Sequence, residues 1–142
     1  MSVLNVAAYM LAKLGPMTAM KLQKLVYYSQ SWSLVWDERP LFNEQIEAWA
    51  NGPVTPVLYN EHKGKFVVEP GDIAGDASAL DASATETVDA VLKFYGGKSA
   101  QWLSDLTHSE APWMEARVGL SPGERCNRVI PIFSMAEFYG SL

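Results

Sequence analysis

The first fourteen residues have the hydrophobic pattern of an amphipathic helix. Apolar side chains recur every three or four residues, at Leu4, Ala7, Ala8, Leu11 and Leu14. Ser2 stands where an N-cap hydroxyl is needed, and Gly15-Pro16 would stop the helix. The pattern therefore predicts a helix over residues 2–14 with one face buried.

The next segment is apolar on two sides. Thr18 is positioned to cap a helix that runs to about Val35. One stripe of this helix contains Leu22, Leu25, Val26, Ser29, Trp32 and Trp36, and the other contains Met20, Tyr27, Ser31 and Leu34. A helix that is apolar on both sides is buried on both sides, so we expect this helix to be the centre of the fold.

The middle of the chain gives mixed signals. Residues 44–50 fit a strand by alternation and a helix by composition, and the sequence leaves this choice open. Asn51-Gly52-Pro53 indicates a sharp turn in which the glycine can take a positive φ. Pro56 suits the first position of a short helix, so we expect one over Pro56–Lys63 with Thr55 as its cap.

A long loop is expected after this short helix. Phe66-Val67-Val68 is a β-like run, and residues 69–82 are rich in Gly, Asp, Ala and Ser with little apolar bulk. Such a composition is typical of a mobile loop. Ser83-Ala84-Thr85-Glu86 then has the spacing of a capping box and predicts a helix. Its buried face would contain Ala84, Val88, Val91, Leu92 and Tyr95.

The C-terminal third predicts three more elements that are helical and one that is strand-like. Ser99 can cap a helix ending near Thr107, and Pro112 can begin a short one. Val129–Phe133 is strand-like, at an edge because it contains a proline. Ser134-Met135-Ala136-Glu137 is a second capping-box sequence, which predicts a terminal helix.

These elements predict a mainly α fold of about six helices, with room for one small β-sheet. The 142 residues are the size of one ordinary domain, and a chain of about 150 residues buries roughly 68–70% of its unfolded surface. Neither side of the loop at 69–82 is large enough for a separate core. We therefore expect residues 1–142 to form a single domain.

The charge of the chain is unevenly distributed. Its net charge is −5, which argues against a non-specific nucleic-acid binder. Residues 1–36 contain Lys13, Lys21 and Lys24 and no acid, whereas the rest of the chain carries eight bases and sixteen acids. Such a dipolar surface suits a charged protein partner. The alternative is that these lysines are the solvated edges of two apolar helices.

Several classes of site are excluded by the composition. The lone Cys126 cannot form an intrachain disulfide, and with two histidines it cannot complete a four-ligand zinc site. The longest uncharged stretches have 12 residues, against about 20 for a membrane span, and no basic segment precedes the first of them. We expect a cytoplasmic protein with no metal, no cofactor and no membrane contact.

Catalytic motifs are weak. His108-Ser109-Glu110 matches the start of the zinc-deaminase signature, but the paired cysteines that complete it are absent. Asp105 and His108 could meet on one helical face, either to fix the helix end or as a base and its orienting acid. Cys126 lies near two arginines that could lower its pKa, or it is an ordinary loop thiol. The sequence predicts no enzyme, and a small enzyme using Asp105 and His108 is the alternative.

Aromatic side chains are numerous, with five Trp, six Tyr and five Phe. Most are needed to fill the core, yet five tryptophans exceed what one small core requires. Trp and Tyr are favoured at protein interfaces because they bury much area at low entropic cost. The surplus therefore indicates a protein-binding surface or a homodimer.

Two blocks of the sequence together resemble a known family. The first comprises Lys21-Leu22-Gln23-Lys24-Leu25-Val26-Tyr27-Tyr28, Trp32, Pro40-Leu41-Phe42, Glu47-Ala48-Trp49 and Gly52-Pro53-Val54. The second comprises Leu103-Ser104-Asp105-Leu106-Thr107-His108, Glu110 and Pro112-Trp113. Across roughly residues 4–117 their order and spacing resemble the Panacea domain of the SocA-like antitoxins, with the variable loop at 64–82 between the blocks.

The resemblance implies a bacterial or prophage-borne antitoxin. Members neutralise a cognate toxin, encoded by an adjacent gene, through direct binding, and one member delivers its toxin to a protease. Some carry an added DNA-binding region, for which 142 residues leave no room, so we expect no nucleic-acid partner. A phage-associated regulatory or scaffold protein that binds a host protein would have the same sequence features.

The resemblance also marks candidate site residues. Those expected to contact the partner are Lys21, Lys24, Tyr28, Trp32 and Trp49. Other signature positions, which either maintain the fold or touch the toxin, are Gly52, Pro53, His108, Pro112 and Trp113. The family supplies no catalytic residues.

Overall fold

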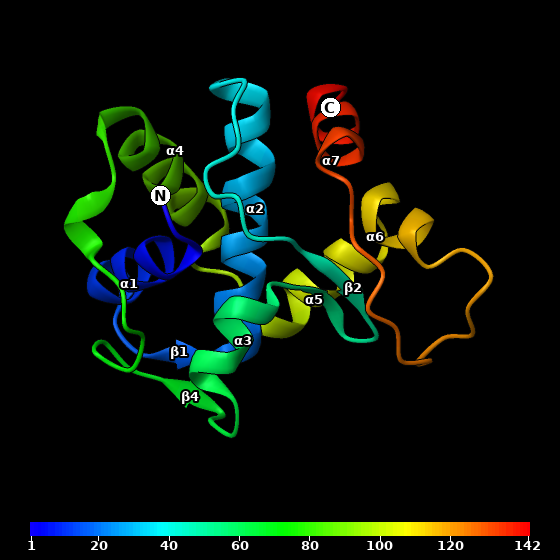
Figure 1. The fold of residues 1–142 in the computed structure, drawn as a ribbon, viewed down its shortest axis with the longest axis horizontal. Helices are drawn as coiled ribbons and strands as arrows, with labels where there is room; N and C mark the ends of the chain where they lie inside the picture. The colour runs from blue at the N-terminus through cyan, green and yellow to red at the C-terminus, as the bar shows by residue number, and fades with distance from the viewer.

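One long helix runs through the middle of the molecule (Figure 1). In the computed structural model, which describes residues 1–142, this helix is α2 (Ala19–Trp36). Its ten consecutive residues Leu22–Ser31 are all buried, which requires neighbours on every side. The prediction of a central helix is confirmed, and α2 contributes to a single cluster of 27 buried hydrophobic residues.

Six shorter helices and two small sheets surround α2. The helices are α1 (Val3–Leu14), α3 (Pro56–His62), α4 (Ala82–Tyr95), α5 (Ala100–His108), α6 (Ala111–Ala116) and α7 (Ile132–Gly140). The strands are β1 (Met17–Thr18), β2 (Glu47–Trp49), β3 (Gly52–Val54) and β4 (Val67–Val68). The fold is mainly α with a minor β component, as predicted. None of these helices combines the length and hydrophobicity required to cross a bilayer.

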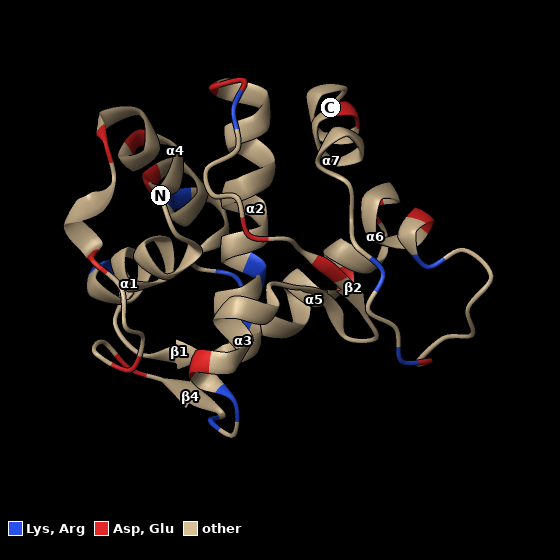
Figure 2. Cartoon of the chain, viewed as in Figure 1, with Lys and Arg blue, Asp and Glu red and all other residues tan.

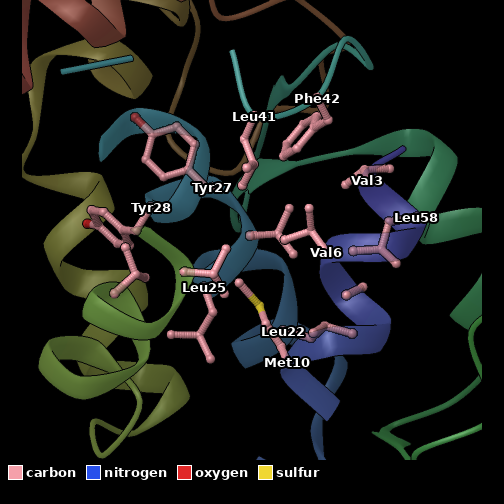
Figure 3. Packing of buried hydrophobic residues seen from close by; sticks show 14 of the residues in the cluster. Val3, Val6, Met10, Leu22, Leu25, Tyr27, Tyr28, Leu41, Phe42 and Leu58 are labelled. Carbon is pink, nitrogen blue, oxygen red and sulfur yellow. The ribbon is translucent and has the colours of Figure 1, made fainter. Parts of the chain in front are cut away.

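The first two helices begin where the sequence places them. The Ser2 hydroxyl accepts a hydrogen bond from the Leu4 amide, and the Thr18 hydroxyl accepts one from the Lys21 amide. Each bond satisfies an amide that has no partner within its own helix. The buried face of α1 then meets α2, and Figure 3 shows Val6 and Met10 directed toward α2.

The choice left open for residues 44–50 is resolved as a strand. Strands β2 and β3 form an antiparallel hairpin in which Ala48 pairs with Pro53, joined by a two-residue turn. Ala48 is fully buried, whereas Glu47 and Trp49 are half-buried on the opposite side, which is the alternation of a strand. The second sheet joins β1 to β4, with Met17 opposite Val68.

The capping prediction for α4 was wrong. The cap of α4 is Asp81, whose carboxylate accepts a hydrogen bond from the Ala84 amide, while the Ser83 hydroxyl accepts one from Arg39. The helix therefore begins before the capping-box sequence. Helix α5 begins as predicted, with the Ser99 hydroxyl accepting from the Trp102 amide. Thr55 is the N-cap residue of α3, but its side chain makes no capping bond.

The strand predicted over Val129–Phe133 was also wrong. Val129 is the one residue of this segment that pairs with a strand, through an isolated bridge to Glu47. Helix α7 already begins at Ile132. Pro131 has no amide to extend a ladder and instead stands at the N-cap of α7. The Ser134 hydroxyl donates to the Pro131 carbonyl from within the first turn, so it is not the cap that the second capping box predicted.

The glycine- and alanine-rich loop at 69–82 lies across α1 (Figure 1). A 3₁₀ turn, Ala77–Ala79, packs on that helix, and Ile73 is buried. The Asp76 amide donates to the Asn5 side chain over 2.9 Å, and any side chain at Gly75 would collide with the Leu4 carbonyl. These contacts attach the middle of the loop to α1. The mobility expected of the loop stays a prediction.

Two glutamines of α2 bind the connection between α2 and α3. The Gln30 carboxamide accepts from the Leu41 and Phe42 amides and donates to the Phe42 carbonyl. The Gln23 carboxamide accepts from the Thr55 amide over 2.9 Å. Both side chains are buried, so each satisfies backbone groups that water does not reach. This is how an irregular segment is held against an apolar helix.

Gln30→Ala is expected to lower the free energy of unfolding by about 2 kcal/mol, because three buried backbone groups lose their partner. Chemical denaturation checks this. Gln101→Ala is the matched control, since exposed Gln101 bonds only Asp105, and it should change stability by less than about 0.5 kcal/mol. Equal effects of the two substitutions would contradict the role given to Gln30.

Candidate functional site

A groove of about 900 Å³ opens beside the N-terminal half of α2. One side is formed by the β2–β3 hairpin, another by α3 and the segment between α3 and β4, and a third by residues 125–127 of the loop between α6 and α7. Its lining residues are Ala19, Met20, Gln23, Lys24, Trp49, Ala50, Asn51, Val54, Tyr59, His62, Gly64, Lys65, Phe66, Arg125, Cys126 and Asn127.

The charges that line the groove are all positive. Lys24, Lys65 and Arg125 contribute to its surface, and no aspartate or glutamate does, although the chain carries a net charge of −5. Figure 2 shows basic residues on the segment between α3 and β4 and on the loop between α6 and α7, which border the groove. Lys65 forms an ion pair with Asp72 over 3.5 Å. The groove therefore favours an anionic ligand.

Lys24 is the most unusual of these residues. Only 1% of it is exposed, and it forms neither an ion pair nor a hydrogen bond. Burial lowers the pKa of its ammonium from the ordinary 10.5 to about 8. An ammonium group at this depth is still largely protonated at neutral pH.

Gly52 makes the space in which the Lys24 ammonium lies. A Cβ atom at Gly52 would be 2.6 Å from Lys24 Cε and 2.7 Å from Nζ. The backbone φ at Gly52 is +125°, which residues with a side chain rarely adopt. The hairpin turn thus needs glycine for two independent reasons, its conformation and its proximity to Lys24.

Aromatic side chains form the walls of the groove, and contacts between their rings hold them in position. The rings of Trp49 and Tyr59 meet edge to face at 4.9 Å, and Tyr59 meets His62 in the same way at 5.4 Å. Gln23 Nε2 lies 3.0 Å from His62 Nε2, and burial lowers the pKa of His62. Phe66 is 71% exposed at the rim, so apolar surface is available beside the buried cation.

A stack of three side chains supports the hairpin from behind. His108 stacks on Trp113 with ring centroids 4.1 Å apart, and the Arg117 guanidinium lies 5.2 Å from the centroid of the same ring. Trp113 Nε1 donates to the Trp49 carbonyl and Arg117 Nη1 to the Ala48 carbonyl, each over 2.9 Å. Helix α6 therefore fixes β2, and through it the position of the groove wall.

A second polar cluster lies in the core between α2, α6 and α7. The Tyr28 and Tyr139 hydroxyls donate to Glu110 Oε1 over 2.6 and 2.8 Å, and Tyr139 also contacts the Tyr27 hydroxyl at 3.0 Å. Burial raises the pKa of Glu110, and these hydrogen bonds partly oppose that shift. All four residues are buried.

The residues considered for catalysis face different surroundings. Glu110 is directed into the tyrosine cluster, whereas exposed Asp105 accepts a hydrogen bond from Gln101. His108 stacks on Trp113, and its Nε2 is buried without a partner. Burial, and after it the charge of Lys24, lower the pKa of His108. No group of three acidic, histidine or cysteine residues could hold a metal ion.

The residues expected from the sequence to bind a partner do not all lie together in the structure. Lys24 and Trp49 line the groove together, and half-buried Lys21 does not line it. Tyr28 is fully buried, and Trp32 donates to the Tyr95 hydroxyl on the other side of α2. The signature positions lie behind the groove: Gly52 and Pro53 in β3, His108 in α5, and Pro112 and Trp113 in α6.

Sequence reasoning missed most of the groove walls. Tyr59, His62 and Phe66 follow the hairpin in sequence, and Arg125 and Asn127 come from a loop far along the chain. Cys126 donates to the Ala48 carbonyl over 2.9 Å, which gives this thiol a structural partner. The one available signal was Lys24 itself, a charged residue within an apolar stripe.

Lys24→Met is expected to stabilise the fold by about 2 kcal/mol at pH 7, because it removes a charge that burial disfavours. The lowered pKa sets the pH dependence. Below pH 8 the ammonium is charged in both states, and between pH 8 and 10.5 the folded state loses its proton first. The advantage of Lys24→Met over the wild type should therefore shrink across that range in denaturation series. An advantage that does not change with pH would contradict a buried, unpaired ammonium.

Two comparisons with known proteins gave a match. Residues 22–114, which contain most of α2, the hairpin, α5 and most of α6, match the family model described as "Antitoxin SocA-like, Panacea domain". Antitoxin SocA of Caulobacter vibrioides (strain NA1000 / CB15N) is 33% identical over 110 residues. That alignment covers 69% of this chain, and the chain spans 58% of the length of that relative.

No solved structure is significantly similar to the chain. The family model covers well over half of the residues and includes the groove residues Lys24 and Trp49 as well as the supporting His108 and Trp113. The chain is therefore a member of the antitoxin SocA-like family, with a Panacea domain.

Proposed function

We propose that the protein is an antitoxin that neutralises a cognate toxin by binding it directly, without catalysis, in the cytoplasm. The observation that carries this proposal is the family match over residues 22–114. The name of the relative, Antitoxin SocA, points in the same direction. The toxin is expected to be the product of an adjacent gene.

The geometry supports a binding role. The groove combines a buried cation, aromatic walls and a rim with exposed apolar surface, which are features of protein-recognition sites. Glu110 accepts from Tyr139, Asp105 accepts from Gln101 and His108 stacks on Trp113, and these separate engagements support binding over catalysis. Binding that covers the active surface of a toxin is sufficient for neutralisation.

Growth rescue tests the proposal. The adjacent open reading frame is induced alone and then together with this chain, and we expect arrest in the first case and restored growth in the second. Asp105→Asn is the control for catalysis, because Asp105 is exposed and bonds only Gln101, and it should rescue as well as the wild type. A harmless neighbour, or a toxic one that this chain does not counteract, would refute the antitoxin role.

Delivery of the toxin to a protease is a finer form of the same proposal. If the chain acts by occupation of the toxin alone, rescue should persist in hosts that lack individual ATP-dependent proteases, and toxin levels should not fall. Rescue that disappears in one such host, together with accumulation of the toxin, would assign an adaptor role instead.

A further inference from the structure

We infer that the groove beside α2 receives a carboxylate side chain of the protein partner, which pairs with the Lys24 ammonium while an adjacent apolar side chain packs against Trp49, Tyr59 and Phe66. The inference rests on the proposed function, because it identifies the surface by which the toxin would be bound.

The Lys24 ammonium has no counter-ion within the chain. A buried charge normally has a partner, and this one has none within the chain. The residue also lines the groove, so the ammonium can be reached from it. A carboxylate in the groove would complete the ion pair and offset the burial of the charge.

The fold keeps a space for the unpaired Lys24 ammonium. Gly52 leaves the space for the ammonium, and the side chain of any other residue would intrude on it. The Trp113 and Arg117 contacts hold the hairpin, and hence Gly52, against α2. A structural role alone would be served better by an apolar side chain at position 24.

The number of buried charges in the groove favours a carboxylate ligand. Lys24 is the one buried cation that lines the groove, since Lys65 is paired with Asp72 and both Lys65 and Arg125 are exposed. A single buried positive charge matches a single negative charge, which favours a carboxylate over a phosphate dianion. Arg125, at the mouth of the groove, would attract an acidic segment at longer range.

The size of the groove indicates that the carboxylate belongs to a peptide segment and not to a small acid. The groove holds about 900 Å³ and exposes aromatic and apolar surface next to Lys24, far more than a small acid could cover. Exposed Phe66 and Met20 extend this surface beyond the cation. A peptide segment with Glu or Asp beside an apolar residue fills both parts.

Binding of the purified chain to the adjacent-gene toxin, measured by calorimetry, tests the inference. Lys24→Met should weaken binding about a hundredfold, the effect of removing one partner of a buried charge pair. Lys93→Met is the matched control, because Lys93 is an exposed lysine on α4 outside the groove, and it should remain within about threefold of the wild type. Thermal unfolding verifies that both variants are folded. Equal affinities of Lys24→Met and the wild type would overturn the inference while leaving the antitoxin role intact.

A peptide series keeps the inference testable when the toxin does not bind or a variant does not fold. Short blocked peptides containing Phe-Glu or Phe-Gln are titrated against the wild type, with the Trp49 indole resonance as readout. We expect saturable shifts with Phe-Glu and at least tenfold weaker binding of Phe-Gln. Equal binding of the two peptides would overturn the pairing with Lys24. Free glutarate that binds as tightly as the Phe-Glu peptide would overturn the assignment to a protein segment.

Discussion

Glu110→Ala is expected to lower the free energy of unfolding by about 4 kcal/mol, the largest effect of any single polar substitution in this chain. The Glu110 carboxylate accepts hydrogen bonds from the buried hydroxyls of Tyr28 and Tyr139. The Tyr28 hydroxyl would be left without an acceptor, at about 1–3 kcal/mol, and the Tyr139 hydroxyl would keep only Tyr27. The vacated space adds a cavity term. Chemical denaturation measures the loss.

Glu110→Gln separates the hydrogen bonds from the charge. The carboxamide keeps the volume and one acceptor oxygen, so this variant should retain most of the stability that alanine loses. Burial raises the pKa of Glu110, which means that the folded state favours the protonated acid. Wild-type stability therefore falls as the pH rises above the unfolded pKa of 4.5 toward the folded one.

The stability of Glu110→Gln relative to the wild type should consequently increase over that pH range. Denaturation series from pH 4 upward, within the range where both proteins refold reversibly, check this sign. If Glu110→Ala is as stable as the wild type, the acid–tyrosine cluster does not hold α6 and α7 to α2.

Gly52→Ala is expected to cost about 3 kcal/mol of stability and to displace Lys24. The φ of +125° strains any residue with a side chain, at about 1–3 kcal/mol. The new Cβ would also lie 2.6 Å from Lys24 Cε, so the ammonium must leave its slot. Denaturation measures the first effect, and toxin binding measures the second.

Two comparisons separate the backbone strain from the collision. Gly119 also has a positive φ, of +88°, but a Cβ there would meet nothing within 4 Å, so Gly119→Ala should cost only about 1 kcal/mol. In a double-mutant cycle, Lys24→Ala removes the atoms that collide and should make Gly52→Ala less costly. Strictly additive effects of Gly52→Ala and Lys24→Ala would contradict a direct contact between these positions.

The elements that could be predicted from the sequence are those that local rules determine. Ser2, Thr18 and Ser99 cap helices by bonds to amides two or three residues away, so their spacing is visible in the chain. The two apolar stripes of α2 predicted its burial for a similar reason. The central position of α2 followed from composition and periodicity alone.

The wrong predictions arose where distant contacts override local patterns. Asp81 and Ser83 both stand near the start of α4, and the carboxylate of Asp81 takes the cap while Ser83 bonds Arg39, a residue 44 positions away. Within residues 44–50, Glu47–Trp49 become a strand because β3 pairs with β2 on one side and residues 128–130 bond the segment on the other. Neither partner is visible from the segment itself.

The groove was only partly predictable for the same reason. The family resemblance marked Lys24 and Trp49, and both line the groove. It equally marked Tyr28 and Trp32, which lie in or against the core instead. Burial of a lysine and the lack of an acid near it depend on the whole fold, so the sequence could not distinguish Lys24 from the neighbouring, more accessible Lys21.

Neutralisation of a toxin through direct contact is the central property that we propose for this protein. Mixing the purified chain with the purified product of the adjacent gene, followed by size-exclusion chromatography and an assay of the toxin's activity, tests it most directly. We expect the two proteins to elute together and the activity to fall in proportion to the complex formed. Separate elution with full toxin activity, from a chain shown to be folded, would contradict the account.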